Sequence, residues 1–267
     1  MKTFIAEFQE RSKDVLEYLN LLKFMDSVAT NKRKPIESES YQGSMISYLP
    51  NRDCQKILRA NFYLILYNLV ESTLNTVISV VKDTINDERV PLNKLVTRLI
   101  LLHISGLYKD VTSQNRILEI SKDFYQKTVN NENVLLEKLG FNTSGNVDYN
   151  YFQKVVGAIG CRGKLTIEEN RVKDAMERTK DHRNKLAHGN WSFSVAGSML
   201  TLSQIEEDYQ RIYDYLNQSL YNLESFLDNK KYLKLLLSGK TFSNKNNLGL
   251  TLLTKYQPFW LSLYLLN

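Results

Sequence analysis

The sequence predicts an all-α protein. Only 11 of its 267 residues are Gly and only 4 are Pro, so the chain contains few of the residues that interrupt a helix. Leu, Lys, Asn, Glu and Tyr dominate, which is typical of long helices joined by short loops. The length allows one large domain or a domain with an extension, and either can bury a sizeable apolar core.

The first predicted helix extends from Phe4 to Met25, where apolar residues recur near helical spacing with acidic and basic residues between them. The following stretch, Thr30 to Asn51, is polar and contains Pro35, Gly43 and Pro50. Because this stretch has no sustained period, we expect a long loop there, which can include a short strand or turn.

The second predicted helix, Asp53 to Lys82, contains no Gly or Pro. Its apolar residues cover well over half of the helix circumference, which is typical of a helix in the centre of a bundle. Pro91 suits the first position of a third helix that extends to about Leu107. One or two further helices are expected between Ser113 and about Lys138.

The next two helices are predicted from their end signals. Residues 147–159 form a short helix that is closed by a glycine. Thr166 and Glu169 have the spacing of a capping box, which predicts that a longer helix begins at Ile167. Gly189 is well placed to end that helix in the left-handed conformation.

The last long helix is predicted to begin at a second capping box, Ser203–Glu206, and to continue to about Leu227. We therefore expect a helical domain over residues 1–233 and a C-terminal extension of undefined role over residues 234–267. The apolar run 258–266 within that extension is too short to span a bilayer. It is expected to dock on the protein or to bind a partner, and not to anchor the chain in a membrane.

Charge and cysteine content limit the function only weakly. The chain has 35 basic and 29 acidic residues, a formal charge of +6 and a pI near 9.1, which mildly favours an anionic partner. Cys54 and Cys161 are too few and too far apart for a disulfide framework or a zinc site, so two buried thiols in a reducing cytoplasm are expected. The N-terminus meets charge before any apolar run, which indicates no signal peptide.

A polar cluster occupies the end of the helix that is predicted to begin at Ile167. The run from Lys180 to Asn190 places Arg, Asn, Lys and two His residues in its last turns. Asn184 and His188 are four residues apart, so their side chains share one face of the helix. Arg183 lies next to this stripe, on the side of the helix that packs. Such a combination is unusual on a helix that only has to bury an apolar face.

The residue types in this cluster suit chemistry on a phosphodiester. A helix C-terminus stabilises positive charge, which favours the imidazolium form of His188 and suits it to general acid–base work near neutrality. Arg183 offers a planar fork of donors that matches a phosphate and can stabilise the charge of a phosphorane. The alternative is that both residues only cap the helix and solvate its end, because Arg and His at this spacing also occur by chance.

A second polar feature lies in the predicted central helix. Asn68, Glu71, Ser72 and Asn75 follow one another at i, i+3, i+4 and i+7 and form one stripe in an otherwise apolar helix. A buried carboxylate needs a partner, so we expect an ion pair between Glu71 and Arg183 that aims the guanidinium. The alternative is that the stripe faces solvent on a less central helix.

These residues carry a resemblance to a known family. The run Arg183 to Gly189 (RNKLAHG) resembles the Arg-x(4–6)-His signature of the HEPN superfamily, in which a polar residue, often Asn, commonly follows the Arg. Three stretches resemble the bacterial MAE-like branch of that superfamily, in the order expected: residues 66–73, residues 144–148 and residues 187–193. The resemblance covers roughly residues 16–233.

The resemblance implies an up-and-down helical bundle with extra helices and loops, which dimerises so that both copies of the motif face one cleft. Family members with an intact motif are typically metal-independent endoribonucleases, often toxins or effectors of antiphage defence. Carried over, Arg183 and His188 would be catalytic, Asn184 would assist and Glu71 would orient Arg183. No cofactor or metal is expected, and the expected compartment is the cytoplasm.

The implied reaction is attack of the ribose 2′-hydroxyl on the adjacent phosphorus, which leaves a cyclic phosphate and a 5′-hydroxyl. Lys180, Lys185 and Trp191 are the candidate substrate-binding residues, although Trp191 could instead anchor its loop on the bundle. The expected partners are RNA, a second copy of the chain and an antitoxin or defence-system protein. The alternatives are a non-catalytic HEPN module that binds RNA, nucleotide or a partner protein, and a purely structural helical adaptor.

Overall fold

The computed structural model describes residues 2–30, 35–40, 43–109, 111–130, 132, 135–141 and 145–234. Over these residues the protein is all-α apart from one small hairpin, as the sequence predicts. The expected C-terminal extension, including the apolar run 258–266, lies almost entirely outside the described residues. Its separation from the helical domain therefore stays a prediction.

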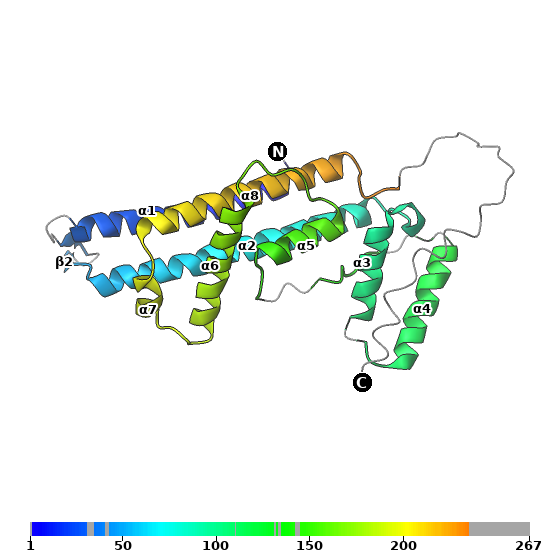
Figure 1. Ribbon diagram of the computed structural model, residues 1–267, viewed down its shortest axis with the longest axis horizontal. Coiled ribbons are helices and arrows are strands. Elements are labelled where there is room, and N and C mark those ends of the chain that lie inside the picture. The colour runs from blue at the N-terminus through cyan, green and yellow to red at the C-terminus, as the bar shows by residue number, and fades with distance from the viewer. Residues whose placement is uncertain are drawn as a thin grey trace. The chain divides into compact units, whose positions relative to one another are not determined.

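Three long helices form the body of the bundle: α1 (Thr3–Thr30), α2 (Arg52–Asp87) and α8 (Leu202–Asp228). Figure 1 shows them lying side by side, while α6 (Glu169–Ala187) crosses them steeply. Helix α2 contacts the other three and also α7, so the sequence is right to place it at the centre. This helix is long and apolar enough to cross a membrane, but 44% of its most apolar stretch is buried in the protein, and core helices pass the same test.

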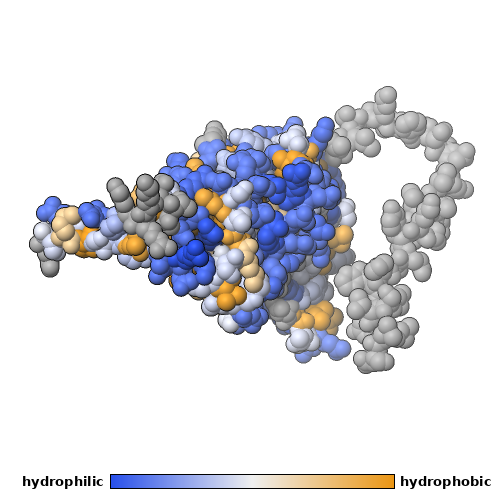
Figure 2. Space-filling model, turned by 60° about the vertical axis from the view of Figure 1, so that its left-hand side comes forward, coloured by the Kyte–Doolittle hydropathy of each residue, from blue (hydrophilic) through white to orange (hydrophobic). Residues whose placement is uncertain are grey.

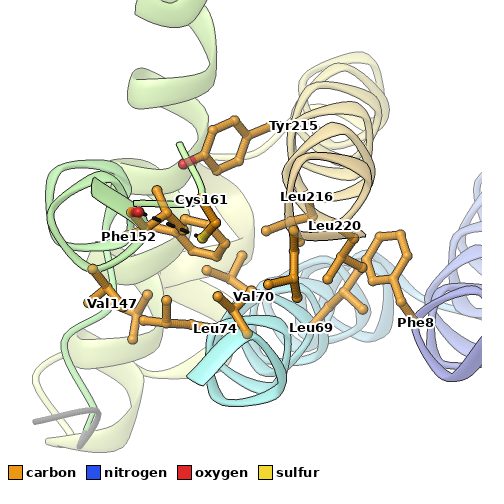
Figure 3. Packing of buried hydrophobic residues seen from close by; sticks show 14 of the residues in the cluster. Phe8, Leu69, Val70, Leu74, Val147, Phe152, Cys161, Tyr215, Leu216 and Leu220 are labelled. Carbon is orange, nitrogen blue, oxygen red and sulfur yellow. Dashed lines mark hydrogen bonds between the residues drawn. The ribbon is translucent and has the colours of Figure 1, made fainter. Parts of the chain in front are cut away.

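The bundle core is apolar and is centred on α2. Figure 3 shows Leu69, Val70 and Leu74 of α2 among side chains contributed by three other helices, including Phe152, Leu216 and Phe8. Helix α5 (Tyr149–Ile159) completes this layer. It begins at Asp148, whose carboxylate accepts the backbone N–H of Tyr151, and ends at Gly160 with φ +93°. The prediction of a short helix closed by a glycine is confirmed.

The stretch that was predicted to be a loop contains an antiparallel hairpin of β1 (Ile36–Glu39) and β2 (Met45–Tyr48). The hairpin forms a thin arm, seen at the left in Figure 2, on a surface that is otherwise mostly hydrophilic in this view. Almost all of its residues are exposed, and Met45 is 69% exposed. Because neither face of the hairpin is buried, its sequence lacks the alternation of apolar and polar residues by which strands are recognised.

Two predicted helix boundaries between residues 90 and 140 are wrong. Pro91 precedes a short 3-10 turn, Leu92–Lys94, and α3 begins only at Thr97 and ends at Tyr108. The intervening backbone is extended because Leu95 pairs with Leu233 at the other end of the domain. Helix α4 covers Gln114–Val129, so it ends nine residues before the predicted limit.

Both predicted capping boxes are also wrong. The backbone N–H and the hydroxyl of Thr166 both donate to Gln218 Oε1 of α8, so Thr166 does not cap α6, which begins at Glu169. The cap of α8 is Thr201, whose hydroxyl accepts the N–H of Gln204, and not Ser203. In the first case, Thr166 bonds to a side chain of a distant helix and not to the helix that follows it. In the second, the hydroxyl of Thr201, two residues before Ser203, is the N-terminal cap.

The segment after α6 contains a helix that the sequence did not indicate, α7 (Phe193–Ser198). This helix packs closely on α2: a Cβ atom at Gly197 would lie only 1.8 Å from the carbonyl oxygen of Lys56, so only glycine fits there.

Of the two cysteines, Cys161 is buried as expected, and burial raises the pKa of its thiol to about 12. Cys54 is only half-buried, so the expectation of two buried thiols is wrong for it.

Candidate active site

The C-terminal half of α6 lies against α2 and the segment 145–148, and Arg183 is at the centre of this contact. Arg183 is half-buried. Nη1 donates to the carbonyl oxygen of Gly145 at 3.3 Å and to Asn184 Oδ1 at 3.0 Å. The Cζ atom lies 5.0 Å from the centroid of the Tyr67 ring, which is a cation–π distance. Two helices and one loop therefore aim a single cation.

Glu71 reaches Arg183 only through the backbone. The N–H of Gly145 donates to Glu71 Oε1 at 3.1 Å, while the carbonyl of the same residue accepts from Arg183. Among the described residues Arg183 forms no ion pair, so the structure does not contain the expected pair with Glu71. The reason is steric, since Gly145 occupies the space between the two side chains. Its φ of +75° favours glycine, and a Cβ there would lie 3.4 Å from Nη1.

The polar stripe on α2 follows the alternative that it faces solvent. Asn68 and Asn75 are exposed, whereas Glu71 and Ser72 are half-buried. The argument that Glu71 needs a cation because it is buried is therefore wrong. Its partner is a backbone N–H, which satisfies a half-exposed carboxylate without the cost of burying a charge.

The segment 145–148 is held by several side chains besides Arg183. Asn184 Nδ2 donates to Asn146 Oδ1 at 3.1 Å, and the N–H of Val147 donates to the Tyr67 hydroxyl at 3.0 Å. Lys180 Nζ lies 2.7 Å from an Asp148 carboxylate oxygen. Burial by itself raises the pKa of the Asp148 carboxyl, but the hydrogen bonds from Lys180 and from backbone N–H groups outweigh it, so this pKa lies below its usual range. This contact occupies Lys180, a candidate substrate-binding residue, within the protein.

His188 lies at the end of the same helix, directly after its last turn. Its backbone N–H donates to the carbonyl of Asn184, and Gly189 ends the helix with φ +69°, as the sequence predicts. The imidazole is exposed and forms no hydrogen bond with any described residue. The structure therefore does not join His188 to Arg183 directly, although Asn184 contacts both, Arg183 through its side chain and His188 through its carbonyl.

The other two candidate substrate-binding residues contact each other. Lys185 Nζ lies 4.0 Å from the centroid of the Trp191 ring and 2.9 Å from Asp181 Oδ2. Trp191 is half-buried and packs on a small apolar cluster that includes Leu186 and Ala196. The alternative that Trp191 anchors the loop after the motif agrees with this packing. Lys185 remains partly exposed above the ring.

His182 is a buried residue of this region to which the sequence assigned no role. Its ring stacks on the Tyr63 ring with the centroids 4.9 Å apart, and it meets the Trp191 ring edge to face at 5.4 Å. Its Nδ1 lies 2.9 Å from the carbonyl oxygen of Arg178, so Nδ1 carries the proton and Nε2 is buried with no described partner. Burial lowers the pKa of this imidazole. The signal that could have identified it is its place on the packing stripe of α6, one turn after Thr179.

We expect His182 to make the protein less stable at low pH. The folded state lowers the pKa below 6.5, so the unfolded chain takes up the proton first as the pH falls. The free energy of unfolding should then decrease below about pH 6.5, by at most about 1.4 kcal/mol per pH unit from this group. Urea unfolding at about pH 7.5 and about pH 5.5 measures the effect. His182→Phe should remove this part of the decrease and leave that of His103, whose pKa is also lowered; an identical decrease in both proteins contradicts the assignment.

An ion pair between half-buried Arg178 and a buried carboxylate fixes α6 on the bundle. Asp208 of α8 is completely buried, and both of its carboxylate oxygens accept from the Arg178 guanidinium at 2.9 Å. The Tyr63 hydroxyl of α2 and Gln204 Nε2 also donate to this carboxylate, at 2.7 and 2.9 Å. Burial, followed by the neighbouring Asp208 charge, raises the pKa of Tyr63 well above its usual value. This network joins α2, α6 and α8, and its Arg178 lies on α6 five residues before Arg183. No pattern in the sequence indicated it.

The described residues contain no group of three His, Cys, Asp or Glu side chains that could hold a metal ion. The site combines the Arg183 guanidinium, which is held by the Tyr67 ring and by two acceptors, with the exposed imidazole of His188 at the end of the same helix. A family model, described as MAE_28990-like HEPN, matches residues 1–232. No curated protein and no solved structure matches the chain.

Proposed function

The chain belongs to the MAE_28990-like HEPN family, and on that premise we propose that it is a metal-independent endoribonuclease. The observation that carries the proposal is the way Arg183 is held. Nη1 makes both hydrogen bonds that this side chain forms with described residues, which leaves the N–H groups of Nε and Nη2 for a ligand. A guanidinium that is held through one nitrogen and keeps donors on the other two, as among the described residues here, suits bidentate binding of a phosphate.

The proposed reaction uses only side chains. A neutral His188 imidazole takes the proton of the ribose 2′-hydroxyl, whose oxygen attacks the adjacent phosphorus. Arg183 stabilises the charge on the phosphorane oxygens. The bond to the 5′-oxygen then breaks, and a protonated imidazole donates its proton to the leaving oxygen. The products are a 2′,3′-cyclic phosphate and a 5′-hydroxyl, and DNA resists because it lacks the nucleophile.

One exposed imidazole at a helix end cannot be the base and the acid of the same step, so the proposal includes a homodimer. A second copy placed on a two-fold axis would bring its own Arg183 and His188 to the same phosphodiester. The exposure of His188 agrees with a group that acts across an interface. A toxin or antiphage-defence effector, restrained by an antitoxin or another protein of its system, is the biological role that we propose for such an enzyme.

The second candidate is a non-catalytic HEPN module that binds RNA, nucleotide or a partner protein through the same surface. The lack of direct contact between His188 and Arg183 within a protomer favours it. Incubation of single-stranded RNA with the protein in EDTA separates the two candidates. The proposed enzyme leaves cyclic-phosphate ends on the products, whereas the binding module changes fluorescence polarisation of labelled RNA without forming any product.

Tyr67 should act as a positioning residue for Arg183. Tyr67→Leu removes the ring below the guanidinium, and a cation–π contact of about 0.5–2 kcal/mol predicts a decrease in kcat of about 2- to 30-fold with little change in KM. Tyr67→Phe retains the ring and loses only the acceptor of the Val147 N–H, so it should keep most of the rate. Tyr221→Leu, at an exposed position of α8, is the control. A Tyr67→Leu protein with wild-type kcat contradicts this role.

A further inference from the structure

A groove lined by lysines lies further along the face of α2 from which Glu71 holds Gly145. It is formed by α2, the end of α3 and the segment 137–141. Its described lining includes three ammonium groups, those of Lys82, Lys109 and Lys138, against a single carboxylate, that of Glu137. Asn75 and Ser79 add an amide and a hydroxyl. The groove therefore has a net positive charge and several hydrogen-bond donors.

These lysines are not consumed by strong internal ion pairs. Lys109 Nζ donates to the carbonyl of Phe141 at 3.0 Å, and Lys82 has only a 3.4 Å contact with its neighbour Asp83. Lys138 is exposed and forms no ion pair with a described residue. Each ammonium group therefore retains N–H donors for an anion, in contrast to Lys180, whose charge is matched by Asp148.

The position of the groove is fixed by the packing of its walls. Asn86 of α2 exchanges two hydrogen bonds with the backbone of Leu136, at 2.8 and 3.2 Å. On the other side, α3 approaches so closely that a Cβ at Gly106 would lie 2.4 Å from the carbonyl oxygen of Lys138. The backbone that carries Lys138 is therefore tied to both helices, and the groove is present before any ligand binds.

The groove is connected to the Arg183 site by one face of α2. Glu71, which holds Gly145, is followed at intervals of four, four and three residues by Asn75, Ser79 and Lys82, so all four share that face. At 1.5 Å per residue, Glu71 and Lys82 are about 16 Å apart along the helix. Lys109, Lys138 and Glu137 also line the neighbouring hollow, where Arg116, Glu119 and Asp123 bring the charges into balance. The excess of positive charge therefore belongs to the groove on α2, to which Lys82 contributes.

We propose that this lysine groove binds the phosphates of a single RNA strand that flank the scissile bond. The proposal rests on the proposed ribonuclease function and extends it, because it makes the substrate a strand of several nucleotides and not a mononucleotide. Ammonium groups recognise phosphate charge without reading bases, so the groove contributes affinity and register and leaves sequence preference to other parts of the site.

The test compares two triple variants. In the first, Lys82, Lys109 and Lys138 are each replaced by Gln; in the control, the exposed residues Lys13, Lys154 and Lys164 are replaced in the same way, which removes an equal charge. Binding of labelled single-stranded RNA and DNA of about 20 nucleotides is measured by polarisation over a range of salt concentrations, with both triple variants also carrying His188→Ala so that the RNA stays intact. For the groove variant, the slope of log Kd against log salt should decrease by about 2, which follows from about 0.7 per phosphate contact.

The same law predicts that the groove variant binds on the order of 100-fold more weakly than the control near 0.1 M salt, with RNA and DNA affected alike. Equal affinities and slopes for the two triple variants overturn the proposal. So does a loss confined to RNA, since phosphates are common to both polymers. Circular dichroism verifies that both variants keep their helices. A slope change together with a wild-type protein that never cuts RNA refutes the nuclease and retains the groove, so the two failures are distinguishable.

Discussion

Replacing either Arg183 or His188 with alanine is expected to slow cleavage of single-stranded RNA by about 10²- to 10⁴-fold, the range for the loss of a proton-transferring group or of a donor to a developing oxyanion. Arg183 is the only side chain on this face of α6 that is held by both Tyr67 and Gly145 within the described residues. His188 is the neighbouring imidazole that solvent can reach. Initial rates measured in EDTA check the prediction.

The matched control is Arg171→Ala, on the same helix, which removes an exposed Arg that pairs with Glu168. It should cut RNA at the wild-type rate. His188 is exposed, so His188→Ala should retain the helicity and the unfolding midpoint of the wild type. Arg183→Ala should also retain the helicity, but it loses the contacts with Tyr67 and Gly145 and should unfold somewhat earlier. Wild-type rates in both alanine variants would falsify the site assignment.

Mixed dimers test whether the site is shared. If catalysis needs the His188 of both copies, one as base and one as acid, a dimer of one wild-type chain and one His188→Ala chain should be inactive. When the two proteins are unfolded, mixed and refolded together, activity should therefore decrease with the square of the wild-type fraction, because only wild-type homodimers keep both imidazoles. If activity decreases in direct proportion to the wild-type fraction while affinity capture of one tagged chain shows that heterodimers form, each chain cleaves by itself and the composite site is wrong.

The largest effect on stability is expected for Arg178→Ala, which should lower the free energy of unfolding by about 3–5 kcal/mol. The variant leaves the Asp208 carboxylate completely buried with the Tyr63 hydroxyl and Gln204 as its remaining donors. Removing one partner of a buried pair is costly because the other charge remains desolvated. Urea unfolding monitored by circular dichroism measures the change.

Arg171→Ala also serves as the control for this prediction, because its pair with Glu168 is exposed on both sides and should contribute only about 0–1 kcal/mol. A double variant, Arg178→Leu with Asp208→Leu, should recover much of the lost stability, since apolar residues often replace a buried pair without loss. If Arg178→Ala is no less stable than the Arg171→Ala control, the network does not fix α6 on the bundle.

The existence of a helix was predictable wherever the spacing of its apolar residues shows which face is buried. The apolar stripes of α1, α2 and α8 follow the helical period, so their existence and approximate extent follow from the sequence. The boundaries were less predictable because capping groups compete with tertiary partners. Gln218 takes both donors of Thr166, and pairing of Leu95 with Leu233 delays the start of α3. Neither partner is near in sequence.

The residue pattern alone is enough to predict that the protein is all-α, that α2 is central, and that Arg183 and Asn184 lie at the end of one helix with His188 immediately after it. These properties depend on spacing along a single helix, which the period of 3.6 residues translates into faces. Three features became visible only when the helices were packed: Glu71 meets Arg183 through the backbone of Gly145, the Asp208 carboxylate accepts from Arg178 and Tyr63, and three lysines share a groove. The period of a helix specifies which residues face inward, but the partners they meet there come from distant segments whose packing no local pattern encodes.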